Sequence, residues 1–143
     1  MLMKELARHI IAVANKNSLS ITNLKLQKVL YFSLQTAIKE KIYKKEKLEK
    51  IYDCPFRVWR YGPVVKEIYD SYRIYGANPI IEDERETILF QPLNDTIVYL
   101  LKENSFDLVN RSHQEKFWRK NEMHIIGWRS NIKYSLKDIV KDV

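Results

Sequence analysis

Residues 23–43 are the most constraining segment of this sequence, because apolar side chains occur there around most of a helical wheel. They recur at helical spacing and widen the apolar face beyond a single stripe: Leu24, Leu26, Val29, Leu30, Phe32, Leu34 and Ala37. A helix of this kind is contacted from more than one side. Ser20 or Thr22 can cap its first turn. The sequence therefore predicts a long central helix around which the rest of the chain packs.

Weaker apolar periodicities predict shorter helices on both sides of this segment. Their ranges are 2–15, 64–75, 93–102, 106–109, 112–123 and 135–140. Ser112 and Glu115 have the spacing of a capping box, Ser135 precedes the last helix, and Gly76 can end the helix over 64–75. A chain of 143 residues that is 45% hydrophobic suits one core. We therefore predict a mainly α (α+β) fold, a single compact helical domain over residues 1–143.

Two stretches have the composition of β-structure. Phe56 to Tyr61 alternates aromatic and β-branched residues, and Gly62-Pro63 is expected to end that strand. Ile80 to Gln91 places apolar residues on both sides of an acidic cluster, which favours two short extended pieces around a charged turn. The prediction is a small β element near residues 56–61 and 80–90.

Glycine and cysteine usage excludes several kinds of site. The three glycines, Gly62, Gly76 and Gly127, are far apart, whereas phosphate-binding loops need clustered glycines. Cys54 is the only cysteine, so the chain can form neither an internal disulfide nor a cysteine-based zinc cluster.

Histidine spacing gives no support to an enzyme. His9 lies beside an apolar stripe and is interpreted as structural, and no second histidine follows His113 at the spacing of a helical metal site. A Cys54 nucleophile with His113 or His124 as its base is conceivable, but only Arg57 stands near to activate the thiol. We therefore expect no catalytic residues, no cofactor and no metal ion.

The first residues do not have the pattern of a targeting or membrane segment. Lys4, Glu5 and Arg8 interrupt the apolar residues there, and no run approaches the ~20 apolar residues of a membrane span. The expectation is a cytoplasmic protein without membrane contact.

Aromatic and basic residues crowd together between positions 56 and 75. Tyr, Trp and Arg concentrate binding energy at protein interfaces, and the same mixture can stack on nucleic-acid bases. A third interpretation is that Trp59, Tyr72 and Tyr75 belong to the core. The candidate partner-binding residues are Arg57, Trp59, Arg60, Tyr61, Lys66, Tyr69 and Arg73, together with His113.

Three blocks of the sequence resemble the Panacea domain family, the SocA-like antitoxins that are also labelled GepA-like phage-associated proteins. The blocks occur in the family's order: Ile21 to Phe32, Val58 to Val65 with Ile68-Tyr69 and Tyr75-Gly76, and Leu108 to Glu115 with Trp118. Phe117 replaces a frequent proline, Ser112 replaces the usual threonine, and the stretch between the first two blocks is rich in lysine. These departures leave the expected fold unchanged and concern the partner-contacting surface.

The resemblance implies a mainly helical antitoxin that neutralises a cognate protein toxin by direct binding. It also implies a second possible mode, in which such a protein delivers its toxin to a protease. A phage-encoded inhibitor of a host protein is a further alternative. The resemblance does not identify the toxin, and the oligomeric state is left open.

The formal net charge of +7, from 25 Lys and Arg against 18 Asp and Glu, keeps a nucleic-acid partner open. Residues 39–50 contain six lysines and three glutamates, a pattern that is usual for a solvated helix end and loop. The alternative function is a nucleic-acid-binding regulator that uses this run together with Arg119, Lys120, Arg129 and Lys133.

Overall fold

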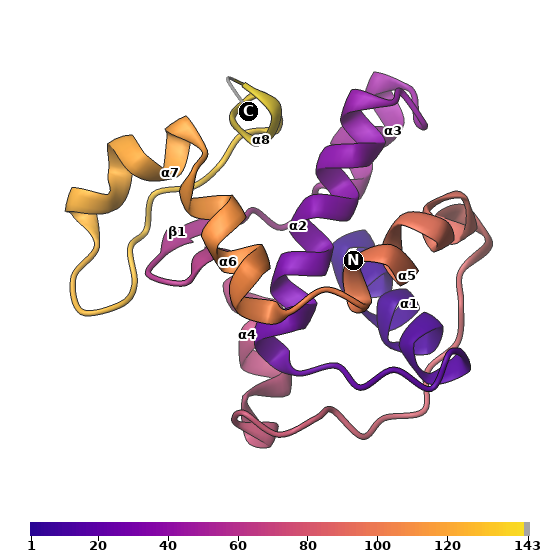
Figure 1. Ribbon diagram of the computed structural model, residues 1–143. Coiled ribbons are helices and arrows are strands. Elements are labelled where there is room, and N and C mark those ends of the chain that lie inside the picture. The colour runs from indigo at the N-terminus through magenta and orange to yellow at the C-terminus, as the bar shows by residue number, and fades with distance from the viewer. Residues whose placement is uncertain (142–143) are drawn as a thin grey trace.

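The structure is a computed structural model that describes residues 1–141, and its α-helices surround one central helix (Figure 1). Eight α-helices lie in this part of the chain: α1 (Leu2–Lys16), α2 (Asn23–Lys39), α3 (Lys45–Ile51), α4 (Lys66–Tyr72), α5 (Asn94–Leu101), α6 (Ser105–His113), α7 (Lys116–Asn121) and α8 (Leu136–Val140). Short 3₁₀ helices cover Arg73–Tyr75, Ile88–Leu93 and Glu122–His124. The predicted mainly α fold with a small β element is confirmed. None of the described helices is long and apolar enough to cross a membrane.

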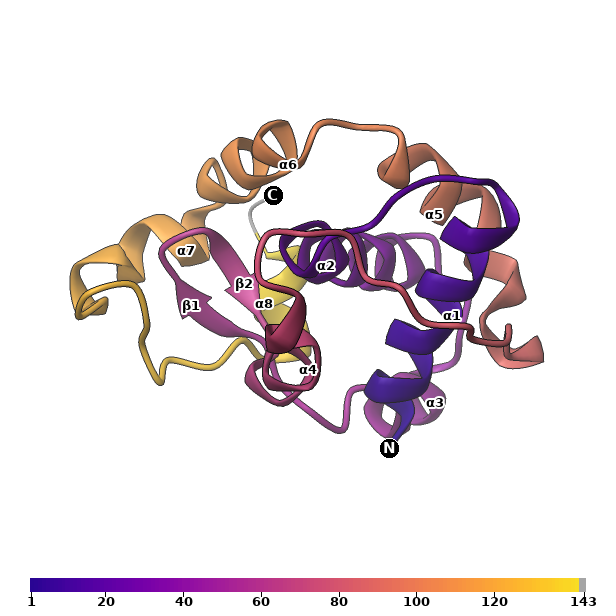
Figure 2. The same ribbon diagram turned by 90° about the horizontal axis from the view of Figure 1, so that it is seen from below.

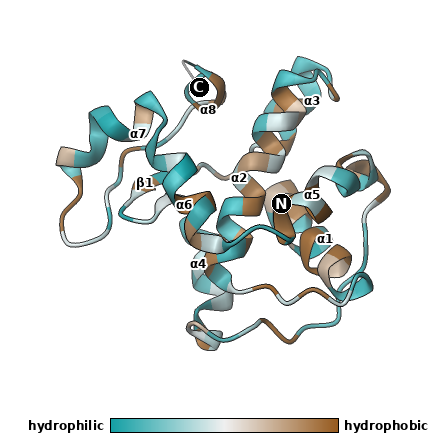
Figure 3. Cartoon of the chain, viewed as in Figure 1, coloured by the Kyte–Doolittle hydropathy of each residue, from teal (hydrophilic) through white to brown (hydrophobic). Residues whose placement is uncertain are grey.

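Helix α2 occupies the centre, as its apolar composition predicts. It contacts α1, α5, α6, α8 and the second strand, β2. Figure 2 shows α1, α3 and α5 on one side of α2 and the hairpin, α7 and the C-terminal segment on the other. Apolar stretches of α1, α2 and α5 lie close together, whereas α7 is largely hydrophilic (Figure 3). The Thr22 hydroxyl accepts a hydrogen bond from the Lys25 amide, so Thr22 is the N-cap of α2.

The small β element is a two-stranded hairpin of β1 (Arg57–Trp59) and β2 (Gly62–Val64). The sequence predicts that Gly62-Pro63 ends a strand, but these two residues lie inside β2. Trp59 faces Gly62 across the tight turn, and Val58 faces Pro63. Antiparallel pairs alternate between hydrogen-bonded and non-hydrogen-bonded, so Pro63 takes a position where a missing amide hydrogen costs no ladder bond.

The outer edge of β1 is covered by the segment 128–134. The Val58 and Arg60 amides donate to the carbonyls of Ile132 and Trp128, each at 2.9 Å. The Ser130 hydroxyl donates to the Val58 carbonyl at 2.5 Å. A C-terminal segment therefore satisfies the backbone of β1 on the side that β2 does not reach.

The prediction of β-structure near residues 80–90 is wrong. Residues 79–87 follow an irregular path, and the 3₁₀ helix Ile88–Leu93 follows them. The segment runs along α1, where the Ile80 amide donates to the Ile21 carbonyl and the Asn15 side chain donates to the Glu82 carbonyl. With its backbone bonded to these groups instead of a neighbouring strand, the segment forms no ladder.

The predicted helix over 112–123 is confirmed only over α7, and the predicted Ser112 cap is wrong. Ser112 lies in the last turn of α6, where its hydroxyl donates to the Val109 carbonyl at 2.7 Å. Glu115 is buried and bonds to α2 rather than to a local cap. The last helix agrees better with its pattern, because Ser135 and Asp138 form a capping box at the start of α8.

Candidate partner-binding site at the hairpin

A cavity of about 390 Å³ lies between the hairpin and the first turns of α2. Four segments form its walls. Helix α2 contributes Asn23, Leu24 and Gln27, and the hairpin contributes Trp59, Tyr61 and Val64. Tyr69 and Arg73 come from α4 and the turn after it, next to Gly76 and Ala77, and Trp128 comes from the C-terminal segment. This size is within the range of ligand-binding pockets.

Four aromatic side chains line the cavity: Trp59, Tyr61, Tyr69 and Trp128. The Trp59 and Tyr69 rings meet edge to face with centroids 5.2 Å apart. The Arg129 guanidinium covers this pair, 4.5 Å from the Trp59 centroid and 5.7 Å from that of Tyr69. Trp128 and Tyr61 stand at the mouth, 52% and 44% exposed. The cavity is thus an aromatic pocket with a cation stacked on one wall.

The polar side chains of the floor are engaged inside the protein. The side-chain nitrogen of Asn23 donates to the Tyr69 carbonyl at 3.0 Å, and its side-chain oxygen accepts from the side-chain nitrogen of Gln27 at 3.3 Å. The Gln27 carbonyl oxygen accepts from the Val65 amide at 2.9 Å. These bonds fix α4 and the hairpin relative to α2, and they leave the interior of the cavity mainly apolar.

Lys28, the next residue along α2, anchors β2 from below. Its side chain is fully buried, and the ammonium donates to the Pro63 carbonyl at 2.7 Å. Burial lowers the pKa of Lys28 to about 7. Gly62 allows this approach: its φ is +98°, and a Cβ there would lie 2.4 Å from the Ser112 hydroxyl and 3.1 Å from Cε of Lys28.

Helices α6 and α7 hold the tip of the hairpin. Nε2 of His113 donates to the Arg60 carbonyl at 2.8 Å, and the Trp118 indole donates to the Trp59 carbonyl at 2.8 Å. The His113 and Trp118 rings stack with centroids 3.7 Å apart, and burial lowers the pKa of His113. The Arg60 guanidinium in turn donates to the Gly127 carbonyl, at 2.9 and 2.6 Å. Three segments that are distant in the sequence therefore meet around one hairpin.

Four of the eight predicted partner-binding residues line the cavity: Trp59, Tyr61, Tyr69 and Arg73. The other four lie outside its lining. Arg57 donates to the Asn131 side chain at 3.1 Å, Lys66 pairs with Asp70 at 2.9 Å, and Arg60 and His113 bond as described above. Sequence reasoning missed Asn23, Gln27 and Trp128, because nothing local connects them to the hairpin.

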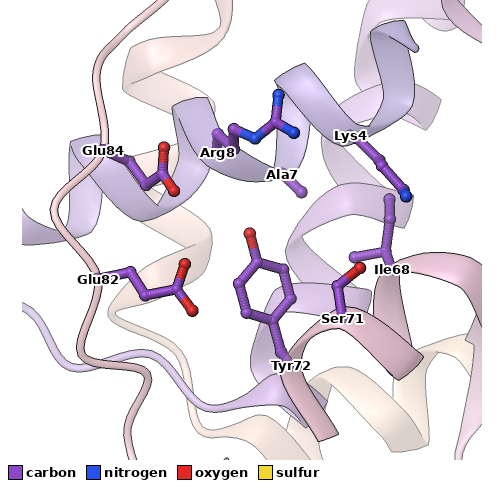
Figure 4. Close-up of a pocket in the computed structure, with 8 residues that line it drawn as sticks. All are labelled: Lys4, Ala7, Arg8, Ile68, Ser71, Tyr72, Glu82 and Glu84. Carbon is purple, nitrogen blue, oxygen red and sulfur yellow. The ribbon is translucent and has the colours of Figure 1, made fainter.

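A second cavity, of about 190 Å³, lies between α1, α4 and residues 82–84 (Figure 4). Charged side chains of both signs line it, with Lys4 and Arg8 on α1 and Glu82 and Glu84 on the opposite segment. The Tyr72 hydroxyl lies between these groups. This cavity is smaller and more polar than the one at the hairpin, and we do not assign it a ligand.

Of the side chains considered for catalysis, Cys54, His9 and His113 are buried or hydrogen-bonded, whereas His124 is exposed. Cys54 is buried, and burial together with Glu67 raises the pKa of its thiol to about 12, which opposes thiolate formation. His9 is also buried; its Nδ1 accepts from the Thr87 amide, and its Nε2 donates to the Asn94 side chain. Within residues 1–141 no group of three His, Cys, Asp or Glu side chains could hold a metal ion.

Comparisons of the chain with protein-family models, with curated proteins and with solved structures found no match.

Proposed function

We propose that this protein is an antitoxin that neutralises a cognate protein toxin by direct binding through the surface around the hairpin. The proposal joins the resemblance of three sequence blocks to the Panacea domain family with one structural observation. That observation is an aromatic cavity beside two arginines, Arg73 and Arg129, that form no ion pair with any of the described residues. Inhibition of a host protein or delivery of a toxin to a protease would use the same kind of contact.

The surface in question, called here the hairpin face, consists of Tyr61, Tyr69, Arg73, Ile126 and Trp128. Ile126 is 88% exposed, and Trp128 and Tyr61 are about half exposed. Within the described residues Arg73 forms no ion pair. Protein interfaces combine such exposed aromatic and apolar side chains with arginine, since these residues contribute most of the binding energy.

The alternative of a nucleic-acid-binding regulator has weaker support. The lysine-rich run lies at the end of α2 and on α3, whereas Arg119 and Lys120 lie on α7. Figures 1 and 2 place α3 and α7 on opposite sides of α2. The two groups therefore form no continuous basic stripe of the kind that tracks a phosphate backbone. Glu46 and Glu49 on α3 further dilute its charge.

The experiment is growth rescue by co-expression with the gene that neighbours this one. We expect the neighbouring product to stop growth, the wild-type chain to restore it, and the double variant Arg73→Glu/Trp128→Ala to fail. The matched control is Arg85→Glu/Tyr99→Ala, which changes one exposed arginine and one exposed aromatic residue away from the hairpin. Both variants should keep the wild-type circular dichroism spectrum.

Two results would contradict the proposal. One is full rescue by the folded Arg73→Glu/Trp128→Ala variant, which would remove the hairpin face from the interface. The other is a toxic neighbour whose effect the wild-type chain does not relieve. Retardation of DNA by the wild-type chain, lost on substitution of the α3 lysines, would favour the regulator instead.

A further inference from the structure

We infer that the cavity at the hairpin receives one large apolar side chain from an acidic segment of the partner, and that carboxylates beside that side chain pair with Arg73 and Arg129. This inference rests on the proposed function for the partner's identity as a toxin. The chemistry of the occupant follows from the cavity itself and can be tested separately.

The apolar character of the occupant follows from the walls and the floor. Trp59, Tyr69 and Trp128 supply flat aromatic surface, and the amides of Asn23 and Gln27 are bonded to groups of the protein. Small polar metabolites are oriented by a few convergent polar groups, and here the two side-chain amides of the floor are already bonded within the protein. A large apolar side chain suits this cavity, because it can bury its surface against the aromatic rings.

The acidic character of the flanking residues follows from two arginines, one that lines the cavity and one that stacks on its aromatic wall. Arg73 is the one charged residue among those that line the cavity, and Arg129 covers the aromatic wall. Within the described residues neither arginine forms an ion pair. Asp70, which lies near both, is paired with Lys66 at 2.9 Å. A carboxylate from another chain is therefore the chemical complement of these two arginines, because guanidinium groups bind carboxylates through two parallel hydrogen bonds.

The occupant is a protein segment of another chain rather than a second copy of this one. The formal charge of +7 makes two copies repel each other. This chain does carry one segment of matching chemistry, the exposed Ile81 followed by Glu82 and Asp83. Insertion of that segment into a neighbouring cavity would be a head-to-tail contact, which generates rings or open filaments. Self-association is therefore measured in the same experiment.

The probe is the blocked pentapeptide acetyl-Ser-Asp-Phe-Asp-Ser-amide, titrated into the ¹⁵N-labelled full chain and followed by NMR. We expect saturable shifts of the Trp59 and Trp128 indole signals, with the amides of α5 unchanged. Replacing Phe by Ala in the peptide removes the anchor, and replacing both Asp by Lys removes the ion pairs. Each change should weaken binding at least tenfold, the order of a lost anchor or of a buried charge pair.

Variants of the protein test the same contacts from the other side. Arg73→Glu should reverse the preference between the Asp and Lys peptides, whereas the control Arg85→Glu should leave it unchanged. Ala77→Trp places an indole at the cavity and should abolish binding without removing any wall. Sedimentation should show that the free wild-type chain is a monomer at the NMR concentration.

The inference is overturned by three results. These are equal binding of the Asp and Lys peptides, no indole shift at millimolar peptide, and a wild-type oligomer that Arg73→Glu dissociates. Rescue that depends on the hairpin face without peptide binding would overturn the inference and keep the proposed function. Peptide binding without any dependence of rescue on Arg73 and Trp128 would keep the inference and overturn the proposed function.

Discussion

Helix α2 carries two buried polar clusters that differ in what lies beyond them. The hairpin cluster, Asn23, Gln27 and Lys28, bonds to backbone groups of the hairpin and α4. The C-terminal cluster, Tyr31, Gln35 and Glu115, joins α2 to the start of α7 and to the Ile139 carbonyl of α8. Asn23 and Gln27 of the hairpin cluster line an open cavity, whereas the C-terminal cluster is enclosed within the protein.

The two clusters also differ in how charge is neutralised. Both oxygens of Glu115 accept hydrogen bonds, from the Tyr31 hydroxyl and from the Gln35 amide at 2.9 Å. Burial raises the pKa of Glu115, and these two hydrogen bonds oppose that rise. Among the described residues, Lys28 has one hydrogen-bond acceptor, the Pro63 carbonyl, for an ammonium group with three donors. Buried polar groups on one helix can therefore close a core completely, or can position a binding surface and leave a titratable group beneath it.

The largest expected effect comes from Gly62, where the hairpin approaches Lys28. Gly62→Ala forces a Cβ to within 2.4 Å of the Ser112 hydroxyl at a φ of +98°. We expect a loss of about 4 kcal/mol in the free energy of unfolding, from backbone strain and from overlap in a packed site. Urea denaturation measures it.

Gly76 supplies the control for that substitution. It also has a positive φ, but a Cβ there meets nothing within 4 Å. Gly76→Ala should therefore cost about 1 kcal/mol, the conformational part alone. Equal losses in the two variants would show that the contact with Ser112 and Lys28 does not restrict the hairpin.

The next effect concerns the C-terminal cluster. Glu115→Ala removes the buried carboxylate that accepts from Tyr31 and Gln35 and leaves both donors to share the Ile139 carbonyl, so we expect a loss of about 3 kcal/mol in unfolding free energy. Glu49→Ala, at an exposed position on α3, should change stability by less than about 0.5 kcal/mol. A loss below about 1 kcal/mol for Glu115→Ala, measured in urea, would mean that this cluster contributes little to joining the helices.

The smallest effect is a pH dependence of the unfolding free energy that arises from Lys28 in the hairpin cluster. The pKa of Lys28 is about 7 in the folded protein and 10.5 as its ordinary value, so between these values the unfolded chain binds a proton that the folded chain lacks. Stability should therefore rise with pH across this window. From pH 7 to pH 9 the gain is about 2 kcal/mol, since one proton contributes about 1.4 kcal/mol per pH unit.

Lys28→Met removes the titrating group and keeps an unbranched side chain. The difference in unfolding free energy between the wild type and Lys28→Met, measured in urea, should change by about 2 kcal/mol between pH 7 and pH 9. Parallel stability curves for the two proteins would refute the low pKa of Lys28. Below pH 7 the lysine is charged in both states, so the difference should level off there.

Much of the fold was predictable because its signals are local. The periodicity of residues 23–39 and the Thr22 cap define α2, and Gly76 follows the short helices that end at Tyr75. Local sequence patterns gave wrong predictions where a residue forms a tertiary contact instead of the local one. Glu115 bonds to α2 instead of forming a capping box, and Gly62-Pro63 pairs within the hairpin instead of ending a strand.

The candidate site was predictable only in part, for the same reason. Trp59, Tyr69 and Arg73 are close in sequence and were recognised as an aromatic and basic group. Trp128 and Gln27 reach the cavity through pairing and packing between distant segments, which composition does not reveal. The sequence likewise placed Arg57, Lys66 and His113 with the partner-binding residues, although each is bonded elsewhere.

The pairing of β1 with residues 128–134 has a consequence for how the protein is made. The contact between Ser130 and Val58 spans 72 positions, so the wall that Trp128 forms depends on a long-range closure. During synthesis the helices α1 and α2 and both strands of the hairpin leave the ribosome well before this wall. A nascent chain can therefore pack α1, α5 and α6 around its central helix while the cavity still lacks one side, and the binding surface is completed late.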